Sequence, residues 1–347
     1  MKRRAEASDN ETRIPRETAV LYGHKAAEKA VLEAYRSGRL PHALLISGPC
    51  GIGKATFAYR IARFMFAHPD PAAAEVQSAT SLQVPAEHPV SRRIAAQAQP
   101  DLLLLERTIN EKTGKLRQDI AVDDVRKTIS FFGSTAGSGG WRIAIVDAVD
   151  ELNEHGANAL LKILEEPPRK ALLLLVSHSP ASVLPTIRSR CRSLILRGLS
   201  AEDVARATAA AIDQEENSAD ILEATALAEG SVRRALAFIS EDMLELRRQT
   251  IGMLERLPNL DRQALHALGD RLYGTEPAAL QAFVDAVNGW LASRLRAFPA
   301  DPGTLDRLAR IWQEFNQSSL DTETFNLERK PLVFNLFMAL AHAGRAC

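Results

Sequence analysis

The sequence has few cysteines and no excess of charge of either sign. Of its 347 residues only three are cysteines, Cys50, Cys191 and Cys347, and none of them belongs to a C-x-x-C pair. This spacing argues against a disulfide framework or a zinc knuckle and favours a reducing compartment. Lys and Arg total 43, as do Asp and Glu, so the formal net charge is zero. The chain as a whole therefore lacks the basicity of a protein that binds nucleic acid by itself.

Long apolar runs are also missing from the sequence. No stretch is long enough to span a bilayer, and residues 1–16 are charged and lack the apolar core of a signal peptide. We therefore expect a cytoplasmic protein that does not enter a membrane. Hydrophobic residues make up 46% of the chain and charged residues 25%, which is an ordinary globular composition with length for two or three domains.

A glycine-rich segment lies between a short apolar strand and an amphipathic helix. It runs from Gly48 to Thr56 and reads G-P-C-G-I-G-K-A-T. In phosphate-binding loops of this pattern, glycines let backbone N–H groups surround phosphate oxygens, the lysine neutralises the terminal phosphates, and the next Ser or Thr ligates Mg²⁺. The residues predicted for the first two functions are Gly48, Gly51, Gly53 and Lys54. Ala55 cannot ligate a metal, and Thr56 lies one residue late, about 100° further around the helix. The alternative is a chance glycine turn, in which the lysine would have no function.

An acidic residue ends the apolar strand expected at residues 141–146. Asp147 stands where P-loop ATPases place the carboxylate that holds Mg²⁺. The glutamate that should follow to orient the attacking water is absent, because residue 148 is alanine. Asp150 or Glu151 could replace it, but spacing does not fix their direction. A strand-terminal helix cap is the alternative interpretation of Asp147.

Apolar runs alternate with helical segments through the first two hundred residues. Strands are expected at residues 42–47, 101–106, 141–146 and 171–176, and helices at 19–37, 57–64, 120–132 and 153–166. This alternation predicts a parallel sheet covered on both faces. Residues 67–100 read as an insertion or linker whose order the sequence leaves open. A capping box at Ser200 opens a helix at 204–212, and nearly every later segment has helical spacing.

Several motifs together resemble the bacterial clamp-loader subunits of DNA polymerase III. Besides the loop, they are L-P-H-A at 40–43, N-A-L-L-K at 158–162, L-E-E-P-P at 164–168, S-R-C at 189–191 and G-S-V-R-R-A-L at 230–236. The active members of that family, gamma and tau, carry G-K-T and an Asp-Glu pair. This chain has Gly53-Lys54-Ala55 and Asp147-Ala148 instead, so it resembles the delta-prime branch, which need not hydrolyse ATP.

The resemblance implies the fold class and the partners. We expect an α/β P-loop domain of the RecA-like AAA+ type at residues 1–199 (with the 67–100 insertion), a small helical lid at 200–240 and an all-α collar at 241–347, divided at Ser240. The implied partners are the gamma/tau and delta subunits, the sliding clamp, and primed DNA through the complex. Independent catalysis is not expected of a non-hydrolysing subunit. Polymerase activity should belong to another subunit, because no constellation of metal-binding carboxylates here suits nucleotidyl transfer.

The resemblance also implies functions for three further residues. Arg190 would be an arginine finger presented to the nucleotide of a neighbouring subunit, where a guanidinium stabilises transition-state charge. Ser177 would be a phosphate sensor, and Arg233 the lid arginine that senses this subunit's own nucleotide. The alternative for Arg190 is the solvated face of a loop shared with Arg188 and Arg192.

The resemblance also bears on two cofactors, zinc and a bound nucleotide. Residues 67–100, where relatives often carry a four-cysteine zinc module, contain no cysteine, so no zinc is predicted. ATP or ADP is expected in the loop without efficient hydrolysis.

The alternative functions are an active gamma/tau-like ATPase that uses Thr56 or water in place of the missing hydroxyl, and a nucleotide-binding adaptor outside replication. Glu165 and Glu166 point about 100° apart on their helix, which favours packing or subunit contact over a shared acid–base site.

Overall fold

The structure is a computed structural model that describes residues 14–109, 117, 119–133, 140–239, 241–272, 277–297, 302–325 and 327–345. Ser240 and Cys347, named above, lie outside the described residues, as does most of the charged N-terminal segment. The chain forms two compact units, the first ending at Ala235 and the second beginning at Leu236. The finer division at residues 199 and 240 stays a prediction.

Five parallel strands in the order β2-β3-β4-β1-β5 form the sheet of the first unit. The strands are β1 (Ala43–Ser47), β2 (Leu102–Glu106), β3 (Arg142–Asp147), β4 (Ala171–Ser177) and β5 (Arg192–Ile195). β1 and β4 are buried along their whole length, which explains their uninterrupted apolar sequences. The four predicted strands lie within one residue of the observed bounds at each end.

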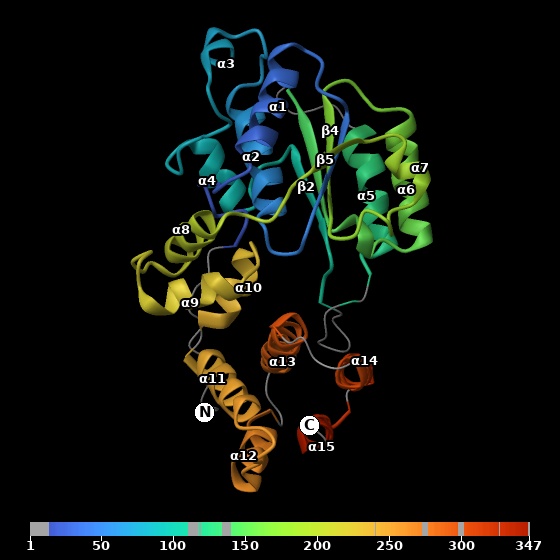
Figure 1. Ribbon diagram of the computed structural model, residues 1–347. Coiled ribbons are helices and arrows are strands. Elements are labelled where there is room, and N and C mark those ends of the chain that lie inside the picture. Colours follow the sequence, from blue (N-terminus) through green and yellow to red (C-terminus); the bar gives the residue numbers. More distant parts are fainter. Residues whose placement is uncertain are drawn as a thin grey trace, which may run out of the picture. The chain divides into compact units, whose positions relative to one another are not determined.

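Helices cover both faces of the sheet (Figure 1). On one face, α1 (Lys25–Arg36), α2 (Lys54–Ala67) and α4 (Pro89–Ala95) pack against alternate strand residues such as Leu44 and Ile46. The other face carries α5 (Val122–Gly133), α6 (Glu154–Glu165) and α7 (Pro185–Arg188), and a 3-10 turn, η1 (Val149–Glu151), precedes α6. Two separate apolar layers result, because successive strand side chains point to opposite faces.

Helix α1 begins at Lys25, so the prediction of a helix from residue 19 was wrong in its start. His24 has a left-handed backbone with φ of 55°, which does not continue a right-handed helix. The preceding segment is held by α2 instead. The Arg63 guanidinium donates to the Thr18 carbonyl at 2.8 Å, and that of Arg60 donates to the Ala19 carbonyl at 3.1 Å.

Residues 67–100, whose order the sequence left open, belong to the first core. They contain α3 (Ala74–Ser78) and α4, and their apolar side chains Val76, Val84 and Ile94 are buried. The Leu82 N–H also donates to a carboxylate oxygen of Glu28 at 2.9 Å. A segment of low apolar content is thus fixed by a few well-spaced contacts.

The remainder of the chain is helical. After β5 come α8 (Ala201–Ile212), α9 (Ala219–Leu227) and α10 (Val232–Ile239). The predicted cap of α8 is confirmed, because Ser200 Oγ accepts from the Asp203 N–H at 3.1 Å. None of the described helices has both the length and the apolar character needed to cross a membrane.

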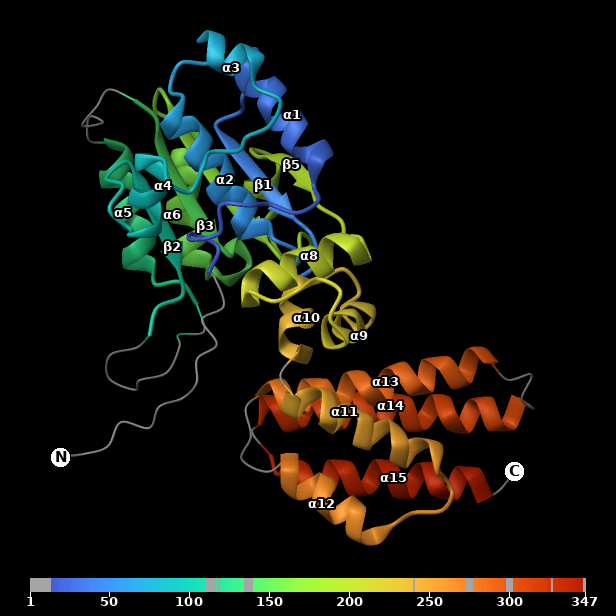
Figure 2. The same cartoon turned by 90° about the vertical axis from the view of Figure 1, so that its left-hand side faces the viewer.

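The second unit is a bundle whose helices pack in pairs (Figure 2). Its helices are α11 (Glu241–Glu255), α12 (Arg262–Leu272), α13 (Pro277–Ala297), α14 (Pro302–Thr324) and α15 (Arg329–Arg345). α11 packs on α13, α12 on α15, and α14 on both α13 and α15. The apolar side chains Leu265, Leu268 and Leu272 of α12 are buried, as its helical spacing implies.

Candidate nucleotide site and interface arginine

The glycine loop joins the carboxyl end of β1 to the first residue of α2, so the predicted order of strand, loop and helix is present. Gly48, Gly51 and Gly53 all have positive φ, of 150°, 76° and 95°. Gly53 is the N-cap residue of α2, and Lys54 opens the helix. The loop therefore places its lysine at a helix N-terminus, where backbone N–H groups and the helix dipole favour an anion.

Lys54 is almost completely buried, with 3% of its surface exposed. Its Nζ donates to the carbonyl oxygens of Gly48 at 2.7 Å and Pro49 at 2.5 Å. Burial lowers the pKa of Lys54, while the charges of Cys50 and the nearby carboxyl groups act against that change. A buried cation at a helix N-terminus fits a phosphate group.

The carboxylate side of the site is present in part. Asp147 ends β3 and lies in register with Glu106, the last residue of β2. Burial, together with the charges of Glu106 and Glu151, raises the pKa of Asp147 to about 6. Thr56 lies in the first turn of α2, and Ala55 offers no oxygen ligand. The residues therefore fit a phosphate better than a complete magnesium site.

Asp150 and Glu151, the two candidates to orient an attacking water, are both engaged elsewhere. The Asp150 carboxylate accepts from Ser177 Oγ at 2.7 Å, from the Ser179 N–H at 3.2 Å and from the His178 N–H. Glu151 Oε2 pairs with Nε of Arg107 at 2.7 Å. The position left by Ala148 is therefore not filled by either neighbouring carboxylate.

The start of α10 rests directly on the glycine loop. The Arg233 N–H donates to the Gly51 carbonyl at 3.3 Å, and Arg233 Nη1 lies 3.7 Å from Cys50 Sγ. A Cβ atom at Gly51 would lie 2.3 Å from Ser231 Oγ and 2.5 Å from Arg233 Cβ. Only glycine fits here, and the lid arginine predicted from sequence does lie over the loop.

Arg190 lies apart from the other predicted site residues. It occupies the turn between α7 and β5, and β5 begins two residues later at Arg192, in register with Leu44 near the start of β1. Lys54 follows the opposite end of β1. Because β1 has five residues, the two edges of the sheet are separated by about 15 Å of strand alone. Gly48, Gly51, Gly53, Lys54, Asp147, Ser177 and Arg233 lie at the carboxyl edge, and Arg190 lies at the amino edge.

The motif residues around Arg190 contact one another. Arg190 Nη2 pairs with Glu165 Oε1 at 2.8 Å, and its Nη1 donates to the Thr186 carbonyl at 2.9 Å. At the same edge His42 Nε2 donates to the Leu164 carbonyl at 3.1 Å. The half-buried Cys191 follows Arg190, and burial raises its pKa to about 12. A thiol with that pKa is inert at neutral pH, as expected of a cysteine that serves in packing.

Sequence reasoning missed two contributors to these contacts, Glu106 and His24, and did not identify the partner of Glu165. Glu106 ends an apolar strand in the same way as Asp147, so its position at the carboxyl edge could have been found. His24, whose Nε2 donates to the Ile52 carbonyl at 2.8 Å, and Glu165 are joined to their partners only by the fold.

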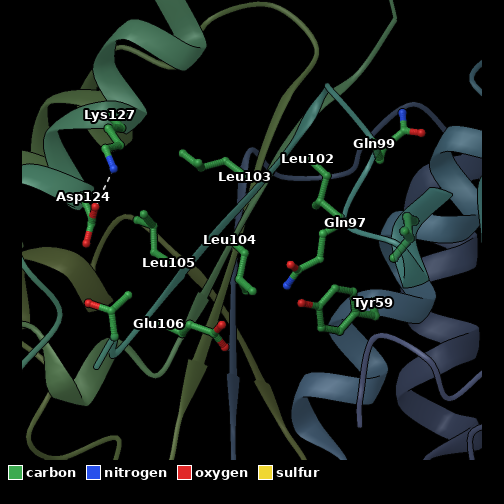
Figure 3. Close-up of a pocket in the computed structure, with 12 residues that line it drawn as sticks. Tyr59, Gln97, Gln99, Leu102, Leu103, Leu104, Leu105, Glu106, Asp124 and Lys127 are labelled. Atoms are coloured by element: carbon green, nitrogen blue, oxygen red, sulfur yellow. Dashed lines mark hydrogen bonds and ion pairs between the residues drawn. The ribbon is translucent and has the colours of Figure 1, made fainter. Parts of the chain in front are cut away.

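A hollow of about 320 Å³ lies along β2, outside the predicted site. Figure 3 shows that side chains from both faces of the strand line it, with Leu103 and Leu105 directed toward Lys127 and with Glu106 near Tyr59. Burial and the charges of Glu106 and Asp147 raise the pKa of Tyr59 to about 12. None of the predicted site residues lines this hollow.

Known proteins similar to the chain agree with the resemblance drawn from its motifs. Residues 23–200 match the family described as "DNA polymerase III, delta subunit". This chain belongs to that family of DNA polymerase III clamp-loader proteins. A curated relative, the DNA polymerase III subunit delta' of Pseudomonas aeruginosa, is 34% identical over 220 residues, which are 62% of this chain and 61% of the relative.

A tau subunit is also among the curated relatives. The DNA polymerase III subunit tau of Escherichia coli K12 is 28% identical over 231 residues, which cover 65% of this chain and 33% of tau. The chain thus spans less than two thirds of the length of these curated relatives. A gamma subunit-related protein of Thermotoga maritima has a similar fold, with a TM-score of 0.50 and 18% identity, over 93% of this chain and all of that chain. The predicted clamp-loader family and the AAA+ fold class are both confirmed.

Proposed function

We propose that this chain is a delta-prime-like, non-hydrolysing subunit of a cytoplasmic DNA polymerase III clamp loader. It would assemble with gamma/tau and delta subunits and help to place the sliding clamp on primed DNA. Its own loop would hold ATP or ADP without hydrolysing it efficiently, and the subunit would not need zinc. Its contribution to chemistry would be Arg190, acting on the nucleotide of a neighbouring gamma or tau subunit.

The position of Arg190 is the observation that carries the proposal. An arginine at the amino edge of the sheet is too far from its own phosphate loop at the carboxyl edge to contact the same nucleotide. A second subunit that brought its loop to this edge would receive the guanidinium in trans. The loss of the hydroxyl at Ala55, together with the engagement of Asp150 and Glu151, supports the view that hydrolysis belongs to the neighbour.

The test is ATP hydrolysis by a loader reconstituted with Arg190→Ala. Removing an arginine finger lowers the rate of ATP hydrolysis about 10³-fold or more at the site that it serves. The clamp-stimulated hydrolysis of the whole loader should therefore fall by at least the fraction contributed by that one site, while the complex still assembles. Arg192→Ala, which removes an exposed arginine two residues away on β5, is the matched control. Unchanged hydrolysis by the Arg190→Ala loader would remove the finger function.

The alternative is an active gamma/tau-like ATPase, which the similarity to tau and the presence of Lys54 and Thr56 favour. DNA-stimulated hydrolysis by the isolated chain that disappears in Lys54→Ala would support this alternative. A titration of ATP with and without Mg²⁺ separates the two candidates further, because a site that lacks the metal hydroxyl should bind nucleotide with little dependence on the ion. A failure to co-purify with any loader subunit would indicate an adaptor outside replication.

A further inference from the structure

The side chain of Arg190 is held by groups from two elements, α6 and α7. Nη2 pairs with Glu165 Oε1 at 2.8 Å, and Nη1 donates to the Thr186 carbonyl at 2.9 Å and to Ser189 Oγ at 3.4 Å. The side chains of Arg190 and Glu165 are 36% and 52% exposed. The guanidinium is thus oriented while it stays open to solvent on the outside of the protein.

Helix stability does not explain a glutamate at position 165. Glu165 is the last residue of α6, where the helix dipole presents partial negative charge and disfavours a carboxylate. An exposed ion pair also contributes little to folding, because water screens it and two long side chains lose freedom. The contact therefore acts on the conformation of Arg190 more than on the stability of the fold.

The end of α6 is itself fixed in place. His42 Nε2 donates to the Leu164 carbonyl at 3.1 Å, which satisfies one of the carbonyl groups left unpaired at a helix end. Two prolines follow Glu166 and prevent the helix from continuing. Glu165 thus projects from a fixed point, and α7 is fixed by its buried Ile187.

We propose that Glu165 is a positioning residue that holds the Arg190 guanidinium in the direction in which it meets the neighbouring subunit's nucleotide. This inference rests on the finger function proposed above. An arginine has several rotatable bonds, and a finger whose rotamers are already restricted loses less conformational entropy when it engages. The carboxylate and the Thr186 carbonyl occupy donors on both terminal nitrogens, and a guanidinium has five donors in all. Donors therefore remain for a phosphate.

The experiment measures steady-state ATP hydrolysis by the loader reconstituted with Glu165→Ala, Glu165→Gln and, as a matched control, Glu166→Ala. Glu166 is the exposed C-cap residue of the same helix and meets the same helix dipole. At the site that Arg190 serves, Glu165→Ala should lower the rate of hydrolysis about three- to tenfold, as expected when a long side chain loses one of its anchors. The kcat of the whole loader should then fall by most of that site's share, with little change in KM. Glu165→Gln keeps an oxygen that accepts from Nη2 and should recover at least half of that loss. Glu166→Ala should match the unaltered loader.

The outcomes separate this inference from the finger function itself. In an Arg190→Ala background, Glu165→Ala should cause no additional loss, and melting temperatures should stay within about 2 °C of the parent because the pair is exposed. If Arg190→Ala lowers hydrolysis but both Glu165 variants match the parent, the positioning function is refuted and the finger stands. Equal losses in the Ala and Gln variants, or a rise in turnover in both, would also refute it. Hydrolysis that is unchanged by Arg190→Ala removes the finger function, and with it the basis of this inference.

Discussion

Ser177 Oγ donates a hydrogen bond of 2.7 Å to the carboxylate of Asp150. Ser177 ends β4 at the carboxyl edge of the sheet and is completely buried. Its predicted function is that of a phosphate sensor, yet its hydroxyl hydrogen is directed to an acidic side chain of the same subunit. The same carboxylate accepts from the N–H groups of His178 and Ser179, so it fixes the start of the segment that leads to α7 and Arg190.

Asp150→Ala should therefore destabilise the first unit by about 2 kcal/mol, because one hydroxyl and two N–H donors lose their acceptor together. Urea unfolding measures the loss, and hydrogen exchange should increase at residues 178 and 179. Asp150→Asn keeps one acceptor oxygen and should give a smaller loss. If the alanine variant unfolds at the same urea concentration as the parent, the carboxylate does not hold this segment.

Gly51→Ala tests the contact between the loop and α10. Alanine at a φ of 76° is disfavoured by about 1–2 kcal/mol, and its Cβ would also meet Ser231 and Arg233. Gly38→Ala is the matched control, since Gly38 has a similar φ of 66° but nothing within 4 Å of an added Cβ. Urea unfolding should show that Gly51→Ala costs about 1–3 kcal/mol more than Gly38→Ala. Equal costs would mean that α10 is not packed on the loop.

The strands and the phosphate loop could be predicted because their signals are local in the sequence. β1 and β4 have no polar side in a sheet that is covered on both faces, so unbroken apolar runs reveal them. α5 shows where this reasoning ends. Val125, Ile129 and Phe132 recur at helical spacing in the sequence, which predicts that all three are buried. Ile129 is nevertheless 40% exposed and Thr128 is buried instead, with its hydroxyl donating to the Val125 carbonyl at 2.5 Å. Apolar periodicity cannot show that a helix will satisfy a buried threonine itself.

The candidate site was predictable only in part, for a related reason. Asp147 and the loop were found because each lies directly after an apolar strand. The pairs of Asp150 with Ser177 and of Glu165 with Arg190 join residues more than twenty positions apart. Helix geometry shows that Glu165 and Glu166 point in different directions. It does not show that the fold brings the turn with Arg190 to the side of Glu165.

Glu28 and Arg60 form an ion pair of 2.6 Å whose side chains are 11% and 7% exposed. Glu28→Gln should destabilise the protein by about 3 kcal/mol, because it leaves the buried Arg60 without an opposite charge. Glu33→Gln on the same helix is the matched control, since its pair with Arg36 is open to water on the Glu33 side, which is 55% exposed. That variant should change the free energy of unfolding by less than about 0.5 kcal/mol. Similar losses in both variants would contradict the assignment of Glu28 as the buried partner.

Asp147 should make the protein less stable as the pH rises. Its pKa is raised by burial to about 6 in the folded protein, whereas an unfolded aspartate titrates near 3.9. Between about pH 4 and pH 6 the folded state thus binds more protons than the unfolded state, so its stability falls through this window and stays lower above it. Two pKa units correspond to about 3 kcal/mol.

Asp147→Asn removes this charge at nearly constant shape and should stabilise the protein at pH 7.5 by up to about 3 kcal/mol. At pH 3.5 both side chains are neutral in the fold, so the gain should vanish. Urea unfolding at the two pH values measures the difference, and Asp123→Asn, at an exposed carboxylate of α5, should show no such trend. An asparagine variant that is no more stable than the parent at pH 7.5 would refute the raised pKa. A larger free energy of unfolding of the Asn variant at neutral pH would mean that the charged carboxylate at the end of β3 opposes folding. Such a cost to stability is expected of a residue that serves ligand binding instead of the fold.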